Sequence, residues 1–97
     1  MEPVVAQTLA HLQEHWAEPM TLQDLAQRWG YRVSYLIQRF KAVTGQTPYQ
    51  TLLHLRLVHA QELLRTTPRT IVSIAHEVGF NDHSHFSQVF RQKLGLT

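Results

Sequence analysis

Apolar residues recur every three or four positions along most of the chain, and this spacing predicts amphipathic helices. The first stripe, Val5, Leu9, Leu12 and Trp16, indicates a helix over about residues 3–17. No segment alternates between apolar and polar residues as a strand does, so the expected fold is all-α. The further predicted helices cover residues 22–29, 33–44, 48–66, 71–78 and 83–94.

The ends of these helices carry capping signals. Thr21 with Asp24, and Thr47 with Gln50, have the spacing of a capping box, in which a hydroxyl and a longer polar side chain satisfy the first backbone amides. Thr70 is expected to cap the helix over residues 71–78. In the helix over residues 33–44, Leu36, Phe40 and Val43 are expected to face inward. The apolar residues of the later helices include Tyr49, Leu52, Leu57, Ile71 and Ile74.

The chain contains an internal repeat. Leu22, Leu25, Ala26, Gly30 and Tyr31 recur 49 positions later as Ile71, Ile74, Ala75, Gly79 and Phe80. After one inserted residue, the correspondence continues at an offset of 50, pairing Leu36, Phe40, Gly45 and Thr47 with Phe86, Phe90, Gly95 and Thr97. Each copy is a helix, a glycine turn and a second helix, which is the pattern of a helix-turn-helix unit.

The repeat also aligns polar residues that should face solvent. A serine, a glutamine and a base recur in both second helices: Ser34 with Ser84, Gln38 with Gln88, and Lys41 with Arg91. Glutamine can bond adenine through two atoms, and a base can reach phosphate or guanine, so these faces suit DNA. The alternative is that serine and glutamine are simply tolerated on a solvated helix face.

Charge is divided unevenly along the chain. Residues 1–24 contain four acids and no lysine or arginine, whereas residues 25–97 contain nine bases and three acids. This surplus favours a polyanionic partner, although a basic face can also be only a solvated one.

Together these residues resemble the DNA-binding domain of the AraC/XylS family of bacterial transcription regulators. The resemblance covers nearly the whole chain, from Thr21 to Thr97. Its most specific part comprises Ile74, Ala75, Gly79, Phe80, Asp82, Ser84, Phe86, Phe90 and Gly95. It implies a tandem of homeodomain-like helix-turn-helix subdomains, over residues 1–47 and 67–97, joined by a long helix over residues 48–66.

The same resemblance implies a function and a set of contact residues. Two recognition helices would enter adjacent major-groove segments of promoter DNA. The expected base-reading residues are Ser34, Ile37, Gln38, His83, Ser84, Ser87 and Gln88, and the expected phosphate contacts are Arg32, Arg39, Lys41 and Arg91. Ile37 departs from the polar residue usual in the family, so either it meets a thymine methyl or this unit reads fewer bases. Arg39 suits a rim position that bonds either phosphate or a glutamate.

Other function classes fit less well. The chain has no cysteine, phosphate-binding loop or His-Glu-x-x-His motif, so we expect neither an enzyme nor a cofactor. His11 and His15 have ligand spacing but lack an evident third ligand, so no metal site is expected. No apolar run reaches the length of a membrane span. The remaining alternative is a helical protein-interaction module without DNA binding.

Partners and context follow from the resemblance. It implies two further partners, RNA polymerase and an N-terminal sensing and dimerising domain outside this chain. It also implies a location in the bacterial cytoplasm, at the nucleoid. Gly45-Gln46-Thr47 leads into a helix, whereas Gly95-Leu96-Thr97 ends the chain, so we expect the second subdomain to be truncated.

Overall fold

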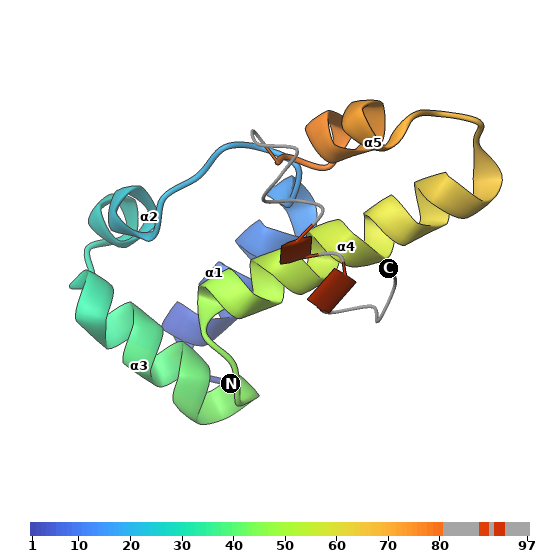
Figure 1. Cartoon of the computed structure of the whole chain (residues 1–97). Helices are drawn as coiled ribbons and strands as arrows, with labels where there is room; N and C mark the ends of the chain where they lie inside the picture. Colours follow the sequence, from blue (N-terminus) through green and yellow to red (C-terminus); the bar gives the residue numbers. More distant parts are fainter. Residues whose placement is uncertain (81–87, 90, 93–97) are drawn as a thin grey trace. The chain divides into compact units, whose positions relative to one another are not determined.

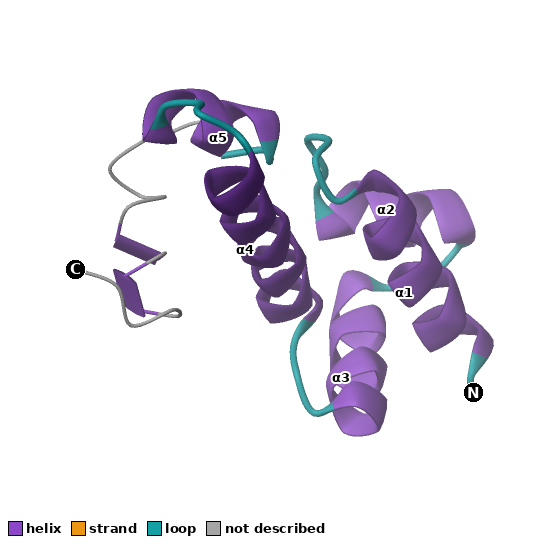
Figure 2. Cartoon of the chain, turned by 90° about the vertical axis from the view of Figure 1, so that its right-hand side faces the viewer, coloured by secondary structure: helices purple, strands orange, loops and turns teal. Residues whose placement is uncertain are grey.

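The regular structure of this chain is helical. The computed structural model describes residues 1–80, 88, 89, 91 and 92, and among these residues it contains no strand, which confirms the predicted all-α class. The helices are α1 (Pro3–His15), α2 (Leu22–Trp29), α3 (Val33–Thr44), α4 (Pro48–Thr66) and α5 (Ile71–Glu77), as Figure 1 and Figure 2 show.

The chain divides into two units, Met1–Leu55 and Arg56–Thr97. We call them unit 1 and unit 2 and describe each by itself. Unit 1 contains α1, α2, α3 and the first part of α4, and unit 2 contains the rest of α4 and α5. The boundary therefore falls inside the helix that was expected to join the two subdomains.

The helix bounds agree closely with the sequence pattern. Helices α2, α3 and α4 begin and end at the predicted residues, while α1 stops at His15 and α5 at Glu77. The helix expected over residues 83–94 lies largely outside the described residues, although 88, 89, 91 and 92 are helical.

Threonine hydroxyls cap three of the helices, as predicted. The Asp24 N–H donates to Thr21 Oγ1 at 3.1 Å, and the Ser73 N–H donates to Thr70 Oγ1 at the same distance. At the start of α4 the bonding is reciprocal. There the N–H of Gln50 donates to the threonine hydroxyl at 3.1 Å, and the threonine N–H donates to the glutamine Oε1 at 2.9 Å.

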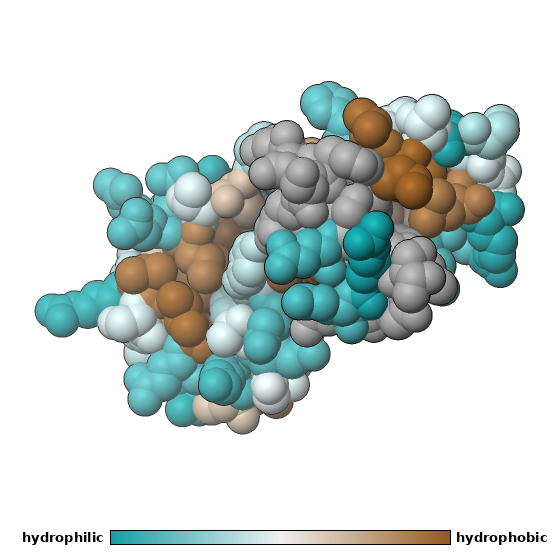
Figure 3. Space-filling view, in the orientation of Figure 1, coloured by the Kyte–Doolittle hydropathy of each residue, from teal (hydrophilic) through white to brown (hydrophobic). Residues whose placement is uncertain are grey.

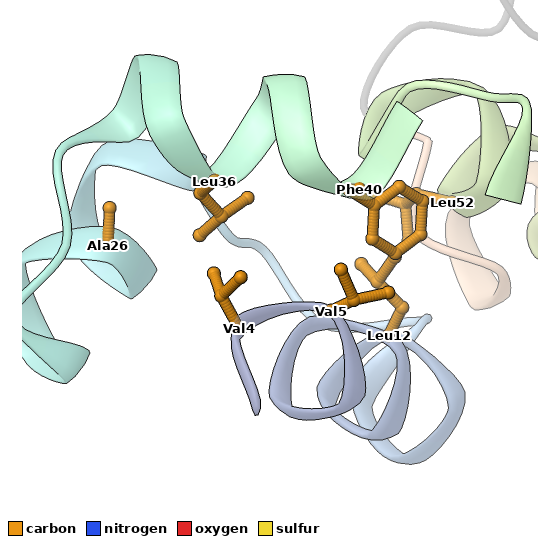
Figure 4. Close-up of a cluster of buried hydrophobic side chains, with 7 residues drawn as sticks. All are labelled: Val4, Val5, Leu12, Ala26, Leu36, Phe40 and Leu52. Carbon is orange, nitrogen blue, oxygen red and sulfur yellow. The ribbon is translucent and has the colours of Figure 1, made fainter. Parts of the chain in front are cut away.

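The core of unit 1 lies where α1, α2 and α3 meet. Val4 and Val5 of α1 point toward Leu36 and Phe40 of α3, with Ala26 of α2 beside them (Figure 4). These side chains are at most 2% exposed. Thr8 is also buried, and its hydroxyl donates a hydrogen bond to the Val4 carbonyl at 2.7 Å. Burial of these apolar groups is the main force that holds unit 1 together.

Three residues of the apolar pattern are exposed. Val43 was expected to face inward but is 44% exposed, so its predicted burial is wrong, and Tyr49 and Ile71 are 51% and 48% exposed. All three lie at helix ends: Val43 on the last turn of α3, the others on the first turns of α4 and α5. Periodicity gives the direction of a side chain around a helix but not whether a neighbouring helix extends far enough to cover it.

The repeat found in the sequence is also a repeat of backbone geometry. In each copy the residue after the turn glycine donates its N–H to the carbonyl of the buried alanine: Tyr31 to Ala26 at 2.8 Å, and Phe80 to Ala75 at 2.9 Å. The glycine adopts a positive φ in both copies, +80° in the first and +100° in the second. Both turns therefore need a residue that tolerates the left-handed region.

Replacing Gly30 by alanine should destabilise unit 1 by about 1 kcal/mol, because an L side chain is strained at φ +80°. No atom lies within 4 Å of the position that a Cβ would take, so the cost comes from the backbone alone. Urea unfolding monitored by tryptophan fluorescence measures it. Gly30→Asn is the control and should lose less, since asparagine tolerates this region better; an equal loss for both would contradict the backbone explanation.

Candidate nucleic-acid interface

One face of α3 is buried and the opposite face is polar. Leu36 and Phe40 are fully buried and define the inward direction. Because successive residues of a helix are rotated by about 100°, Gln38 points directly away from them. Gln38, Ser34 and Lys41 are all exposed, so the predicted outer face of this helix is the solvent face in the structure.

The surroundings of this face favour an anion. Between residues 25 and 61 the sequence has five basic residues and no acidic residue. Arg32 precedes the first turn of α3 and is exposed. The unpaired amides at a helix N-terminus add a partial positive charge at the same place. This end of α3 can therefore hold a phosphate.

Ile37 lies beside the polar outer face of α3 rather than on it. Its side chain is half-buried and packs against the hydrophobic core of unit 1. This packing gives the isoleucine a structural role that is independent of DNA binding. Its contact with a base remains a prediction.

Arg39 forms an ion pair with Glu2 at the start of α1. Its Nη2 lies 2.6 Å from one carboxylate oxygen, and its Nε donates to the other at 2.9 Å. The hydrogen bond from Arg39 lowers the pKa of the Glu2 carboxyl, and the same bond raises the pKa of the guanidinium. Of the two expected partners of Arg39, the structure thus shows the glutamate. We leave Arg39 out of the proposed phosphate contacts.

The equivalent face of unit 2 is described only in part. Gln88 and Arg91 belong to helical residues and are exposed, whereas Val89 between them is 8% exposed. This alternation matches the polar outer face that the repeat predicts. His83, Ser84 and Ser87 lie outside the described residues.

Tyr35 is an exposed residue of this face that the sequence analysis missed. It is 44% exposed, and its ring lies 5.9 Å from that of Tyr31, whose hydroxyl donates to Gln7 Oε1 at 2.9 Å. Comparison of the two copies could not reveal it, because the position 50 residues later is His85. The available signal was its spacing of three residues from Gln38, which places both on one side of the helix.

Unit 1 also has a surface pocket of about 310 Å³. Figure 3 shows hydrophobic side chains gathered over α2 and α3 on one face of this unit. No carboxylate, histidine, lysine or cysteine is among the described residues that line the pocket, so Tyr49 is their only ionisable side chain. Those residues are Leu12, Met20, Thr21, Leu22, Gln23, Val33, Pro48, Tyr49 and Leu52.

The histidine pair of α1 is packed against other side chains. The rings of His11 and His15 lie 4.7 Å apart, and His15 Nδ1 lies 2.5 Å from Glu18 Oε2. Burial, followed by the charges of His15 and Arg28, lowers the pKa of His11. Among the residues that the structure describes, no three or more histidine, cysteine or carboxylate side chains are placed to hold a metal ion.

None of the described helices is both long enough and apolar enough to cross a membrane.

Comparison with known proteins agrees with this geometry. A family model described as a helix-turn-helix domain matches residues 25–97. The HTH-type transcriptional activator RhaS of Citrobacter koseri is 37% identical over 87 residues, which are 90% of this chain and 31% of that protein. The chain thus spans about a third of the length of the curated relatives it matches.

Several similar solved structures cover 99% of the chain. One is the C-terminal domain of AraT, a response regulator from Geobacillus stearothermophilus. It matches with a TM-score of 0.92 and 28% sequence identity, and the match covers 80% of that chain. Another is the DNA-binding domain of the transcriptional factor AdpA, solved in complex with a target DNA. It matches with a TM-score of 0.88 and 29% sequence identity, and the match covers 86% of that chain.

The fold and the exposed face of α3 define a helix-turn-helix domain of the kind that binds DNA in transcription regulators. Within that class, the chain belongs to the AraC-type helix-turn-helix family. The family resemblance predicted from the sequence is confirmed.

Proposed function

We propose that α3 is the recognition helix of unit 1 and that it enters the major groove of promoter DNA. The observation that carries this proposal is the arrangement of α3, which buries Leu36 and Phe40 on one face and exposes Ser34, Gln38 and Lys41 on the other. A helix fits the major groove, where each base pair presents a distinct set of donors and acceptors.

Each exposed side chain of α3 has a role that fits its chemistry. Gln38, at the centre of the face, suits a bidentate contact with adenine, and Ser34 can donate or accept at a neighbouring base edge. Lys41 and Arg32 lie to the sides and suit phosphates, which position the helix without reading sequence. Ile37 remains the candidate for a thymine methyl.

Unit 2 would read a second, adjacent segment of the groove. Its exposed Gln88 and Arg91 correspond to Gln38 and Lys41, so we assign them a base and a phosphate contact. From the sequence, His83, Ser84 and Ser87 join them as base-reading candidates. The two glutamines should therefore affect different base pairs.

We also infer the wider setting from the relatives. RhaS is described as a transcriptional activator, and the AdpA domain was solved with a target DNA. Both support promoter DNA as the partner of this domain. RNA polymerase and an N-terminal sensing and dimerising domain are further proposed partners, and the bacterial nucleoid is the proposed location.

Replacing Lys41 by alanine should weaken binding to every duplex by a similar factor and lower the slope of log affinity against log salt by about one unit. The reason is that a lysine on phosphate releases counterions but reads no base. Fluorescence anisotropy with a labelled duplex at several salt concentrations measures both quantities.

Lys41→Arg is the matched control, since it keeps the charge and should keep the slope. A slope unchanged by Lys41→Ala would remove Lys41 from the phosphate contacts. If the wild-type chain binds no duplex even at low salt, the alternative of a helical protein-interaction module takes the place of this proposal.

A further inference from the structure

We propose that Tyr35 is an additional DNA contact of unit 1, in which its phenolic O–H donates a hydrogen bond to a backbone phosphate at one wall of the groove. Tyr31 and Gln7 hold the ring in position for this bond. The inference rests on the proposed entry of α3 into the major groove and adds a contact residue that the repeat does not indicate.

The position of Tyr35 around α3 favours the wall of the groove over its floor. Gln38 points directly away from the buried Leu36 and Phe40. Tyr35 precedes it by three residues, so it lies about 60° to one side of that direction. A side chain at the centre of a recognition helix meets base edges, whereas one displaced to the side meets the sugar-phosphate backbone.

Contacts within unit 1 hold the ring of Tyr35 in place. It is 44% exposed, yet it lies against Tyr31, with 5.9 Å between ring centroids and 31° between ring planes. Tyr31 is itself tied to α1, because its hydroxyl donates to Gln7 Oε1 at 2.9 Å. A side chain that is already restrained loses less conformational entropy when it binds.

On the C-terminal side of Tyr35, the neighbouring positive charge is already paired. Arg39 follows Tyr35 by four residues, which is the spacing of neighbours on a helix face. Its guanidinium is paired with the Glu2 carboxylate at 2.6 Å. A neutral donor therefore takes the place that a free arginine would otherwise fill, and tyrosine is among the residues that bond phosphate oxygens in this way.

A neutral donor predicts a distinctive result. Tyr35→Phe keeps the ring and removes only the hydroxyl, so it should weaken binding about tenfold for every duplex, as expected for one lost hydrogen bond to a charged group. The salt slope should stay unchanged, because no positive charge is lost and no counterion release with it. Gln38→Ala should instead change base preference, and Lys41→Ala should change the slope.

Tyr49→Phe is the matched control. Tyr49 is also exposed, at 51%, and lies in unit 1 at the start of α4, where it lines the surface pocket. The same chemical change there should leave affinity unaltered. Thermal unfolding of each variant checks that the fold is retained.

The positioning role of Gln7 has its own test. Gln7→Ala should weaken DNA binding less than Tyr35→Phe does. Added to Tyr35→Phe in a double variant, Gln7→Ala should cause no further loss of affinity. Such non-additivity is expected only if Gln7 acts through Tyr35. Additive losses would overturn the positioning role.

The experiment separates failure of this inference from failure of the proposed function. Wild-type affinity for Tyr35→Phe, with Gln38→Ala still changing base preference, would overturn the Tyr35 contact and leave the recognition helix intact. A loss confined to one base pair would overturn the phosphate assignment, and a lowered salt slope would overturn the neutral-donor mechanism. Absence of DNA binding by the wild-type chain would instead contradict the proposed function.

Discussion

Replacing Phe40 by alanine should destabilise unit 1 by about 3–5 kcal/mol, the usual cost of removing a large aromatic side chain from a core. Phe40 is fully buried on the inner face of α3, against the valines of α1 (Figure 4). A small domain has a total stability of about 5–15 kcal/mol, so this change should remove much of it. Both tryptophans of the chain, Trp16 and Trp29, belong to unit 1, so fluorescence during urea unfolding reports on this unit.

Val43→Ala on the same helix is the control for Phe40→Ala. The hydrophobic pattern assigned Val43 to the core, but the structure shows it 44% exposed. Its truncation should therefore change the unfolding free energy by less than about 0.5 kcal/mol. Comparable losses for the two variants would mean that the last turn of α3 is covered after all.

Gln38→Ala should cost about 1–3 kcal/mol of binding free energy at one base pair and relax the preference at that position. The reason is that its amide can meet the N6 and N7 of an adenine together. The preferred site can first be selected from a pool of random duplexes, and each position then varied in competition binding with wild type and variant. An equal loss on every duplex would contradict a base-reading role.

Gln88→Ala provides the companion measurement for unit 2. Gln88 corresponds to Gln38 in the repeat and is also exposed. Its loss should relax preference at a different base pair of the same selected site. If both variants affected the same position, the assignment of one recognition helix to each unit would be wrong.

The sequence predicted the helices well because their signals are local. The hydroxyls of Thr21, Thr47 and Thr70 each accept a backbone N–H from three residues later, and such a bond depends on few other parts of the chain. Gly30 and Gly79 similarly mark turns whose left-handed backbone favours glycine. These residues set the helix bounds with little help from tertiary packing.

What the sequence could not predict depends on contacts between helices. Glu2 and Arg39 are 37 positions apart, and nothing in either local pattern indicates that they pair. Tyr35 becomes notable only once its contact with Tyr31 and the bond from Tyr31 to Gln7 are seen. Such contacts depend on how α1 packs against α3, which periodicity along one helix does not specify.

Solvent exposure of the expected site residues was predicted best where the two copies agree. Gln38 and Gln88 recur on outer faces, and both are exposed in the structure. Ile37 and Arg39, where the chain departs from the family or from its own repeat, are the residues with packing or ion-pair roles. Their DNA contacts had the weakest basis in the sequence.

The most direct test of the central claim is a titration of the chain with two labelled duplexes, the selected site and a scrambled version, at low and moderate salt. We predict binding to both at low salt, tighter binding to the selected site, and a steep loss of affinity as salt rises, because counterion release drives the phosphate contacts. Failure to bind either duplex at low salt would contradict the account.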